Sequence, residues 1–271
     1  MSHTYQMILD GEVPYLHGKI NTFGKTFHYY VYYVDGLLID TGPPRAKEAV
    51  ATFVAKVKPD KVFITHYHED HSGNAAFLHE QFGIPIYTNK KTANIIKKKL
   101  PLPLFRRLTW GKASSSPVVS LIADKEIQTK NHRFQVVATP GHSDDHTSLI
   151  DEEKRILFSG DLFLAKKLHY SMKEESIPQL IHSIEHILTC QFDTLYCAHA
   201  GIIPNGQEAL LEKKQFLESL VKQTIKLYEQ GHEVKQIAKM LLPSQKMLYL
   251  FSFGEIAPTH LIRSIILGAK K

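Results

Sequence analysis

Four potential metal ligands lie within six residues near the end of the first quarter of the chain. The stretch HYHEDH contains His66, His68, Asp70 and His71. His66 and His68 are two positions apart, so both imidazoles face the same side of an extended segment. Imidazole and carboxylate groups are the favoured ligands of zinc and of other borderline divalent ions. The stretch therefore predicts a metal site rather than a polar loop with scattered histidines.

Three more residues of the same chemistry occur later in the chain, each after a strand-like run. His142 follows ATPG, Asp161 follows FSG, and His199 follows YCA. Loops at strand ends converge on one edge of an α/β fold, so these side chains can approach the first four. Seven ligand-type residues predict a two-metal site, which needs a bridging carboxylate and a bridging solvent oxygen.

The elements that must position these residues alternate between strand and helix. We predict a hairpin over 27–40 with its turn at Asp35–Gly36, a helix over 45–57, and a buried strand over 61–65 that runs into the histidine stretch. Helices are expected over 72–82 and 177–190. Further strand-like runs lie within 84–88, 118–123, 134–142, 146–151, 155–161 and 194–201.

The pattern becomes helical from Asn205 onward. Asn205 and Glu208 resemble a capping box, Gly231 suits the end of the same helix, and shorter helices are expected over 232–242 and 257–268. The sequence thus predicts a catalytic α/β domain over 1–205 and a C-terminal helical segment over 206–271. These C-terminal helices are a candidate homodimer interface.

Five motifs, in this order, resemble those of the metallo-β-lactamase superfamily. HYHEDH resembles its His-x-His-x-Asp-His signature, and the other four are DTG at 40–42, TPGH at 139–142, SGD at 159–161 and AHAG at 198–201. The resemblance spans roughly residues 20–205 and implies the α/β class, with the αββα sandwich of the superfamily.

The resemblance also implies a role for each residue, carried over by position. The first metal ion would be bound by His66, His68 and His142, and the second by Asp70, His71 and His199. Asp161 would bridge both ions, and Asp40 would support the metal loop without binding an ion. Two divalent ions per chain are expected, with Zn2+ as the default and iron or manganese as alternatives.

Individual positions distinguish between the branches of the superfamily. Histidine at position 68 disfavours the flavodiiron branch, which has an acidic residue there, and the complete set resembles glyoxalase II. Position 164 is leucine where lactonases often have tyrosine, which weakens the lactonase interpretation. No motif aligns with the basic C-terminal residues that glyoxalase II uses for glutathione.

The chemistry that such a site implies is hydrolysis. Two divalent ions lower the pKa of bound water towards about 7, so hydroxide is available without a side-chain base. One ion polarises a carbonyl or phosphoryl oxygen, and Asp70 is the catalytic candidate that orients the hydroxide and shuttles its proton. We predict a binuclear hydrolase of an ester or thioester bond in a small or acyl-bearing anionic substrate. The alternatives are a phosphodiesterase or ribonuclease of the same superfamily and a mononuclear iron persulfide dioxygenase.

The segment Lys90–Lys112 has eight basic residues, no acidic one, and interleaved apolar side chains. Three interpretations stay open: a solvated helix with a connection that packs on the body, a lid that attracts anionic substrates, or a contact with acidic lipid or nucleic acid. Pro-x-Pro at 101–103 argues against one long amphipathic helix. Nucleic acid is a less favoured partner, because no inserted second domain is visible.

Composition adds broad limits. The 271 residues are 43% hydrophobic and 22% charged, with a net charge of +6, which is ordinary for a globular protein and admits anionic partners. No apolar run approaches the roughly 18 residues of a membrane span, and the N-terminus lacks the pattern of a secretion signal. We therefore expect a cytoplasmic protein whose two cysteines, Cys190 and Cys197, are reduced.

Overall fold

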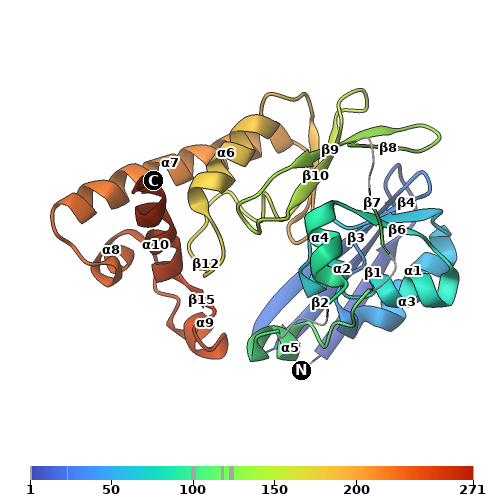
Figure 1. Cartoon of the computed structure of the whole chain (residues 1–271), viewed down its shortest axis with the longest axis horizontal. Coiled ribbons are helices and arrows are strands. Elements are labelled where there is room, and N and C mark those ends of the chain that lie inside the picture. Colours follow the sequence, from blue (N-terminus) through green and yellow to red (C-terminus); the bar gives the residue numbers. More distant parts are fainter. Residues whose placement is uncertain (1, 23, 99–101, 117–118, 122–124, 271) are drawn as a thin grey trace.

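Two β-sheets lie face to face in the computed structural model, and helices cover their outer faces (Figure 1). The structure describes residues 2–22, 24–98, 102–116, 119–121 and 125–270. Within these residues no helix combines the length and the apolarity that crossing a bilayer requires.

The first sheet has seven strands that are neighbours in chain order: β1 (Ser2–Ile8), β2 (Tyr15–Thr22), β3 (Lys25–Val34), β4 (Leu37–Ile39), β5 (Lys61–Phe63), β6 (Ile86–Thr88) and β7 (Ser120–Leu121). The hairpin of β3 and β4 is confirmed, since Asp35 and Gly36 both have positive φ angles, as a two-residue type I′ turn requires. From β4 onward the strands are parallel. The predicted run 118–123 contains β7, but residues 118, 122 and 123 lie outside the described residues.

The second sheet has six strands in the spatial order β14 (Gly201–Ile203), β13 (Thr194–Cys197), β11 (Ile156–Gly160), β10 (Thr147–Asp151), β9 (Arg133–Ala138) and β8 (Glu126–Gln128). Its strands are antiparallel except for β11 and β13. A separate two-stranded sheet pairs β12 (Ser171–Met172) with β15 (Ile256–Ala257). That pairing joins the loop after β11 to the C-terminal part of the chain.

Short helices connect the strands of the first sheet: η1 (Pro44–Ala46), α1 (Lys47–Val57), α2 (Glu69–Ser72), α3 (Ala75–Phe82), α4 (Lys90–Ile96) and α5 (Leu104–Thr109). The basic segment therefore contains two short helices, and the expectation that it is not one long helix is confirmed. Lys99, Leu100 and Pro101 lie outside the described residues.

The remaining helices are α6 (Ile177–Ile187), α7 (Gly206–Glu229), α8 (Val234–Leu241), α9 (Lys246–Phe251) and α10 (Pro258–Ala269). The capping box predicted at Asn205 is wrong, because its side chain makes no capping hydrogen bond. The amide of Gly206 instead donates to the carbonyl of Asp193, so a neighbouring backbone group holds the start of α7. A capping box occurs at Glu233 and Gln236, at the start of α8.

Three clusters of buried hydrophobic residues lie between the layers of this fold and pack them together. The first packs α1 and α3 on the first sheet, through residues such as Val50 and Phe53. The second fills the space between the sheets, where Phe63 of β5 belongs to the same cluster as Phe158 of β11. The third packs α6, α7 and α10 on the second sheet. The order helix, sheet, sheet, helix is the αββα sandwich, so the expected fold class is confirmed.

Candidate metal centre

The potential ligands gather where strands of both sheets end. His66 to His71 follow β5, and Asp40 follows β4, in the first sheet. In the second sheet His142 follows β9, Asp161 follows β11, and His199 follows β13. The loops leave both sheets at the same edge of the sandwich, so side chains that are distant in sequence meet there.

The first group of ligand-type side chains consists of His66, His68, His142 and Asp161. One ligand atom from each lies within 4.8 Å of the others, and all four residues are buried. The closest approach joins His142 Nε2 to His68 Nδ1 at 3.0 Å. His142 Nε2 also lies 3.1 Å from Asp161 Oδ2, so these atoms face a common centre.

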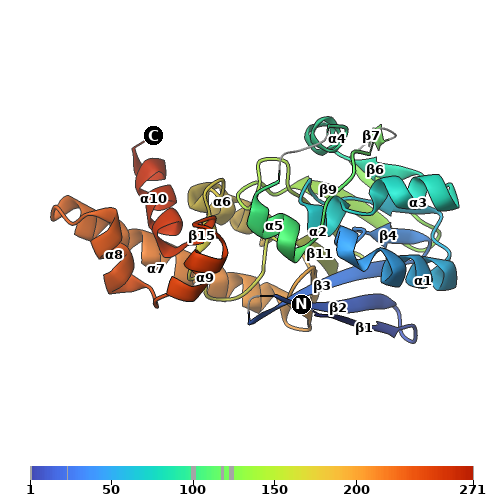
Figure 2. The same cartoon turned by 90° about the horizontal axis from the view of Figure 1, so that it is seen from below.

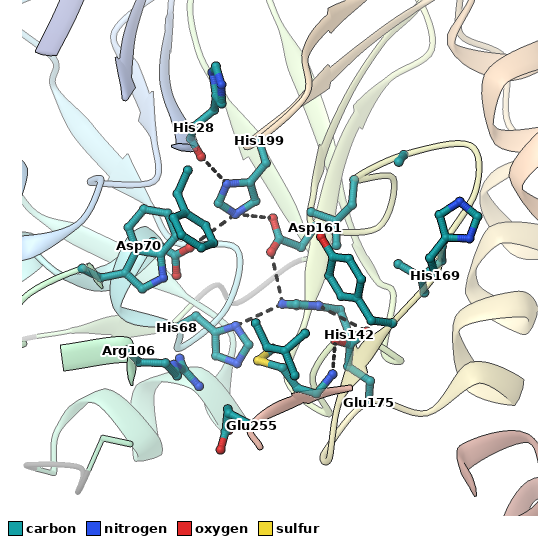
Figure 3. Close-up of a pocket in the computed structure, with 18 of the residues that line it drawn as sticks. His28, His68, Asp70, Arg106, His142, Asp161, His169, Glu175, His199 and Glu255 are labelled. Carbon is teal, nitrogen blue, oxygen red and sulfur yellow. Dashed lines mark hydrogen bonds and ion pairs between the residues drawn. The ribbon is translucent and has the colours of Figure 1, made fainter. Parts of the chain in front are cut away.

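The second group consists of Asp70, His71 and His199, whose ligand atoms also lie within 4.8 Å of one another. His199 Nε2 lies 3.3 Å from Asp70 Oδ2 and 3.3 Å from Asp161 Oδ1. His71 Nε2 is likewise 3.3 Å from Asp161 Oδ1. Asp161 thus turns one oxygen towards each group, which is the arrangement of a carboxylate that could bridge two ions (Figure 3).

Hydrogen bonds behind the rings leave one nitrogen of each of four histidines free to face the cluster. His71 Nδ1 donates to Asp40 Oδ2 at 2.7 Å, and His199 Nδ1 donates to the carbonyl of His28 at 2.6 Å. His68 Nε2 donates to Glu174 Oε1 at 3.0 Å, and His66 Nδ1 donates to Thr65 Oγ1 at 3.0 Å. These partners fix which nitrogen carries the proton.

The inward-facing atoms lack partners that protein groups could supply. His66 Nε2, His71 Nε2 and Asp161 Oδ1 are buried and have no hydrogen-bond partner in the described part of the chain. Several convergent lone pairs of imidazole and carboxylate groups are satisfied together by a divalent cation. The cluster therefore fits metal ions. The ligand roles assigned by position stay a prediction, and all seven residues have come together.

Charge within the cluster changes the affinity of these residues for protons. Burial alone would lower the pKa of His71, but Asp161, Asp40 and Asp70 hold it well above its ordinary value. Burial alone would raise the pKa of Asp161, but His199, His71 and His142 hold it well below. Because a metal ion binds imidazole only without its proton, protons compete with the metal, and loading is expected to weaken as the pH falls.

Two residues that the sequence did not single out support the first group. Glu174 and Glu175 lie in the turn between β12 and α6. Glu174 accepts from His68, and Glu175 Oε2 lies 3.8 Å from His142 Nδ1. The chain has another Glu-Glu pair at 152–153, so no local sequence signal distinguishes the pair that reaches the cluster.

An ion pair lies beside the cluster. Arg106 of α5 and Glu69 of α2 are both buried, and Arg106 Nε donates to Glu69 Oε1 at 2.8 Å. Arg106 also lies 3.5 Å from Glu174. Burial alone would lower the pKa of Arg106, but Glu69 raises it, so its charge is retained and paired. Part of the basic segment thus packs inside the fold.

His146 lies under the cluster. Its Nε2 accepts from the backbone amide of Asp161 at 2.9 Å, and its Nδ1 lies 2.8 Å from Thr139 Oγ1. Burial lowers the pKa of His146 to about 3, so the ring is neutral at ordinary pH. With both nitrogens engaged, His146 holds the loop that carries Asp161.

A cavity of about 380 Å³ opens beside the cluster (Figure 3). Its floor includes His68, Asp70, His142, Asp161 and His199. Its walls come from β3, from α5 and its C-terminal Trp110, from the loop 164–172, and from β15. The volume lies within the range of small-molecule sites.

Comparisons with known proteins agree with this architecture. A family model described as the metallo-beta-lactamase superfamily matches residues 26–215. A metallo-beta-lactamase family protein from Thermus thermophilus superposes with a TM-score of 0.66 at 17% identity, covering 99% of this chain and 94% of that one. This likeness concerns the fold alone.

Functional names occur among the curated relatives. A probable metallo-hydrolase, YybB, of Bacillus subtilis is 30% identical over 53% of this chain, and an atrochrysone carboxyl ACP thioesterase of Aspergillus fumigatus is 28% identical over 66%. The matches span 64% and 52% of these two relatives, less than two thirds of each. A hydroxyacylglutathione hydrolase of Nitrosomonas eutropha is 26% identical over 76% of both chains.

Proposed function

The chain belongs to the metallo-β-lactamase superfamily, and we propose that it is a binuclear metal-dependent hydrolase of an ester or thioester bond. The observation that carries the proposal is the pair of ligand groups that share Asp161 at the floor of a cavity. The relatives named as a thioesterase and as a hydroxyacylglutathione hydrolase add support for the thioester bond. The substrate would be small or acyl-bearing, with an anionic part.

His66, His68 and His142 would hold one ion, Asp70, His71 and His199 the other, and Asp161 would contact both. We propose Zn2+, because the donors are imidazole and carboxylate groups. When bound, such ions supply Lewis acidity, which acidifies water and polarises the oxygen of a scissile carbonyl. The protein would contribute the oriented rings of His66, His68, His71 and His199 and a buried site for the reacting carbonyl.

Asp70 is the side chain that we expect to handle the proton. It lies at the floor of the cavity, and its Oδ2 is 3.3 Å from His199 Nε2. Burial alone would raise the pKa of Asp70, but His71 and His199 lower it, so the carboxylate is ionised at neutral pH. It can therefore accept the proton that water loses as the new C–O bond forms, and deliver it to the leaving thiolate or alkoxide.

The test measures bound metal and substrate preference on the same sample. We expect two zinc ions per chain and turnover of an acyl-coenzyme A thioester or an aryl ester, with no turnover of bis(p-nitrophenyl) phosphate. Preferential cleavage of the phosphate would support the phosphodiesterase alternative. A single iron per chain, with oxygen uptake on glutathione persulfide, would replace the proposal with the dioxygenase alternative.

A further inference from the structure

The cavity beside the cluster has mainly apolar walls. The aromatic part of the lining consists of Phe27 of β3, Phe105 of α5 and Trp110. The aliphatic part consists of Leu164, Met172 and Ile256, from the loop after β11, from β12 and from β15. Phe27 contacts both Phe105 and Trp110 edge to face, with ring centroids 5.9 and 5.6 Å apart. A substrate that leaves the cluster along this cavity meets aromatic and aliphatic side chains.

Three of the titratable residues that line the same cavity are poorly placed to recognise a charged substrate, whereas Lys167, also in the lining, is exposed. Arg106 is occupied by Glu69 and Glu174. The ring of His28 turns away from the cluster, and its Nδ1 lies 2.9 Å from His17 Nε2 (Figure 3). Glu255 directs its carboxylate away from the cluster (Figure 3). A second anionic group deep in the cavity would therefore find no free cation among these three residues.

Exposed apolar side chains in and just after α9 precede the cavity-lining residues Glu255 and Ile256 in the chain. Glu255 and Ile256 line the cavity, and Phe253 lies two residues earlier, within roughly 7 Å along the chain. Phe253 is 65% exposed and Leu250 is 64% exposed. Helix α9 lies beside α5 in both views (Figures 1 and 2). Exposed apolar side chains next to an apolar cavity mark a site for an apolar ligand.

We propose that the cavity binds the acyl chain of the substrate, and that the natural substrates are medium- to long-chain acyl thioesters or esters. The scissile carbonyl lies at the cluster, the chain passes between α5 and β15, and a longer chain extends over α9. This inference rests on the hydrolase function proposed above. Water adds to the carbonyl carbon, the C–S or C–O bond breaks, and the products are a fatty acid and a thiol or alcohol.

Chain-length dependence of hydrolysis tests the proposal. The metal-loaded protein is assayed with acyl-coenzyme A thioesters of two, eight, twelve and sixteen carbons, below their micelle-forming concentrations. Each fully buried methylene contributes up to about a fourfold gain in affinity, so kcat/KM should rise at least tenfold, by a conservative estimate, from two to eight carbons. A flat or falling series would overturn the acyl-chain assignment and leave the hydrolase proposal intact.

Trp110 gives a reading that does not depend on turnover, because it is the only tryptophan of the chain and lines the cavity. The probe is 2-bromododecanoate, whose bromine lies next to the carboxyl group and quenches indole fluorescence on contact; the ring centroids of Trp110 and His199 are 6.0 Å apart, so this end of the probe lies near the indole. Saturable quenching of the metal-loaded protein is expected, and absence of quenching would overturn the assignment. Quenching without hydrolysis of any thioester or ester would refute the hydrolase proposal while supporting an apolar-chain site.

Variants of single residues test where the acyl chain of the substrate lies. Ile256→Gln should raise the probe concentration that gives half-maximal quenching at least fivefold, by a rough estimate from the loss of apolar contact. Leu267→Gln is the matched control, because Leu267 is exposed on α10 and does not line the cavity. Leu250→Gln changes only an exposed side chain, so it should fold normally and lower kcat/KM for sixteen carbons but not for eight. Equal effects of Leu250→Gln on both lengths would contradict the path over α9.

Discussion

The metal-binding cluster and the walls of the cavity differ in how their side chains are held. His66, His68, His71 and His199 each have a hydrogen-bond partner behind the ring, which fixes the ring and its proton. In the walls, Phe27 contacts Phe105 and Trp110 through the rings, and Leu250 of the neighbouring α9 is exposed. Directed bonds suit the orientation that metal binding needs, while undirected contacts suit a chain of variable length. Substitutions in the cluster should therefore abolish activity, whereas substitutions in the walls should reduce it gradually.

The largest effect is expected from Asp161→Ala. Asp161 faces His142 with one oxygen and His71 and His199 with the other. Its loss removes the group shared by both metal sites, so at least one ion should be lost and hydrolysis should fall on the order of 10³-fold or more. Metal content by mass spectrometry and turnover measure both effects.

The control for this change is Asp144→Ala, which removes an exposed carboxylate that pairs with Lys91 outside the cluster. It should keep full metal content and turnover. Wild-type turnover with two ions in Asp161→Ala would show that the shared carboxylate is not needed, and the assignment of the cluster would fail.

Lys213→Met tests how the cluster is attached to the helical layer. Lys213 of α7 is fully buried and donates to the carbonyls of Leu162, at 2.6 Å, and Phe163, just after Asp161. Removing the donor takes away the side-chain partner of the Leu162 carbonyl, whereas the Phe163 carbonyl still accepts from the amide of Ala165. A buried carbonyl left unpaired costs about 1–3 kcal/mol. Part of this cost is offset at neutral pH because burying the ammonium is itself unfavourable. Urea unfolding should give a loss of about 1 kcal/mol at pH 7.

The same variant has a defined pH dependence. Burial lowers the pKa of Lys213 from 10.5 to about 8. Between these two values the unfolded chain binds more protons than the folded protein. The free energy of unfolding of the wild type therefore increases as the pH rises from 8 to 10.5, and this increase is lost when the pH falls back to 8. The advantage of wild type over Lys213→Met should grow by about 2 kcal/mol between pH 7 and pH 10. A constant or shrinking difference would contradict a buried, titrating amine.

Glu174→Gln tests the support behind His68. The carboxylate accepts from His68 and from the hydroxyl of Tyr67, although the side chain is 42% exposed. Glutamine keeps the size and one acceptor but loses the charge, so metal affinity should fall by about tenfold, the lower end for such a partner. Competition with a chelator at pH 7 measures it. Glu153→Gln, in the other Glu-Glu pair and highly exposed, is the matched control, and an equal loss there would contradict the role of Glu174.

The same contrast explains what the sequence could predict. The cluster could be predicted because its residues lie at or just after strand ends, where their spacing in the sequence indicates which side chains can meet. Imidazole and carboxylate groups in such a pattern also indicate metal binding directly. The hairpin at Asp35–Gly36 was accessible because a tight turn restricts its residue types. In both places the signal is local.

The walls and supports depend on long-range packing and carry no local signal. Ile256 reaches the cavity only because β15 pairs with β12, more than 80 residues earlier, through two residues on each side. Phe105 and Trp110 could not be distinguished from a surface segment, since the burial of Arg106 against Glu69 fixes α5 in place. The capping box at Asn205 failed for the same reason, because a backbone contact with Asp193 replaced the local bond.

Lys167→Gln should have the smallest effect and separates charge from apolar contact at the cavity. Lys167 lines the cavity, is exposed, and has no ion-pair partner among the described residues, so its charge reaches an anionic substrate through water. A solvent-screened charge should change KM for an acyl-coenzyme A by about twofold to threefold at low salt and hardly at all at 0.5 M salt. This salt concentration is roughly three times the ionic strength at which the Debye length is 8 Å.

Lys166→Gln is the neighbouring control, because Lys166 pairs with Glu212 at 2.7 Å and does not line the cavity. The chain-length preference should be the same in both variants and in wild type, since it comes from the walls. A tenfold, salt-independent change in Lys167→Gln would mean that the ammonium binds the substrate directly, and the division between a graded apolar wall and a screened rim would no longer hold.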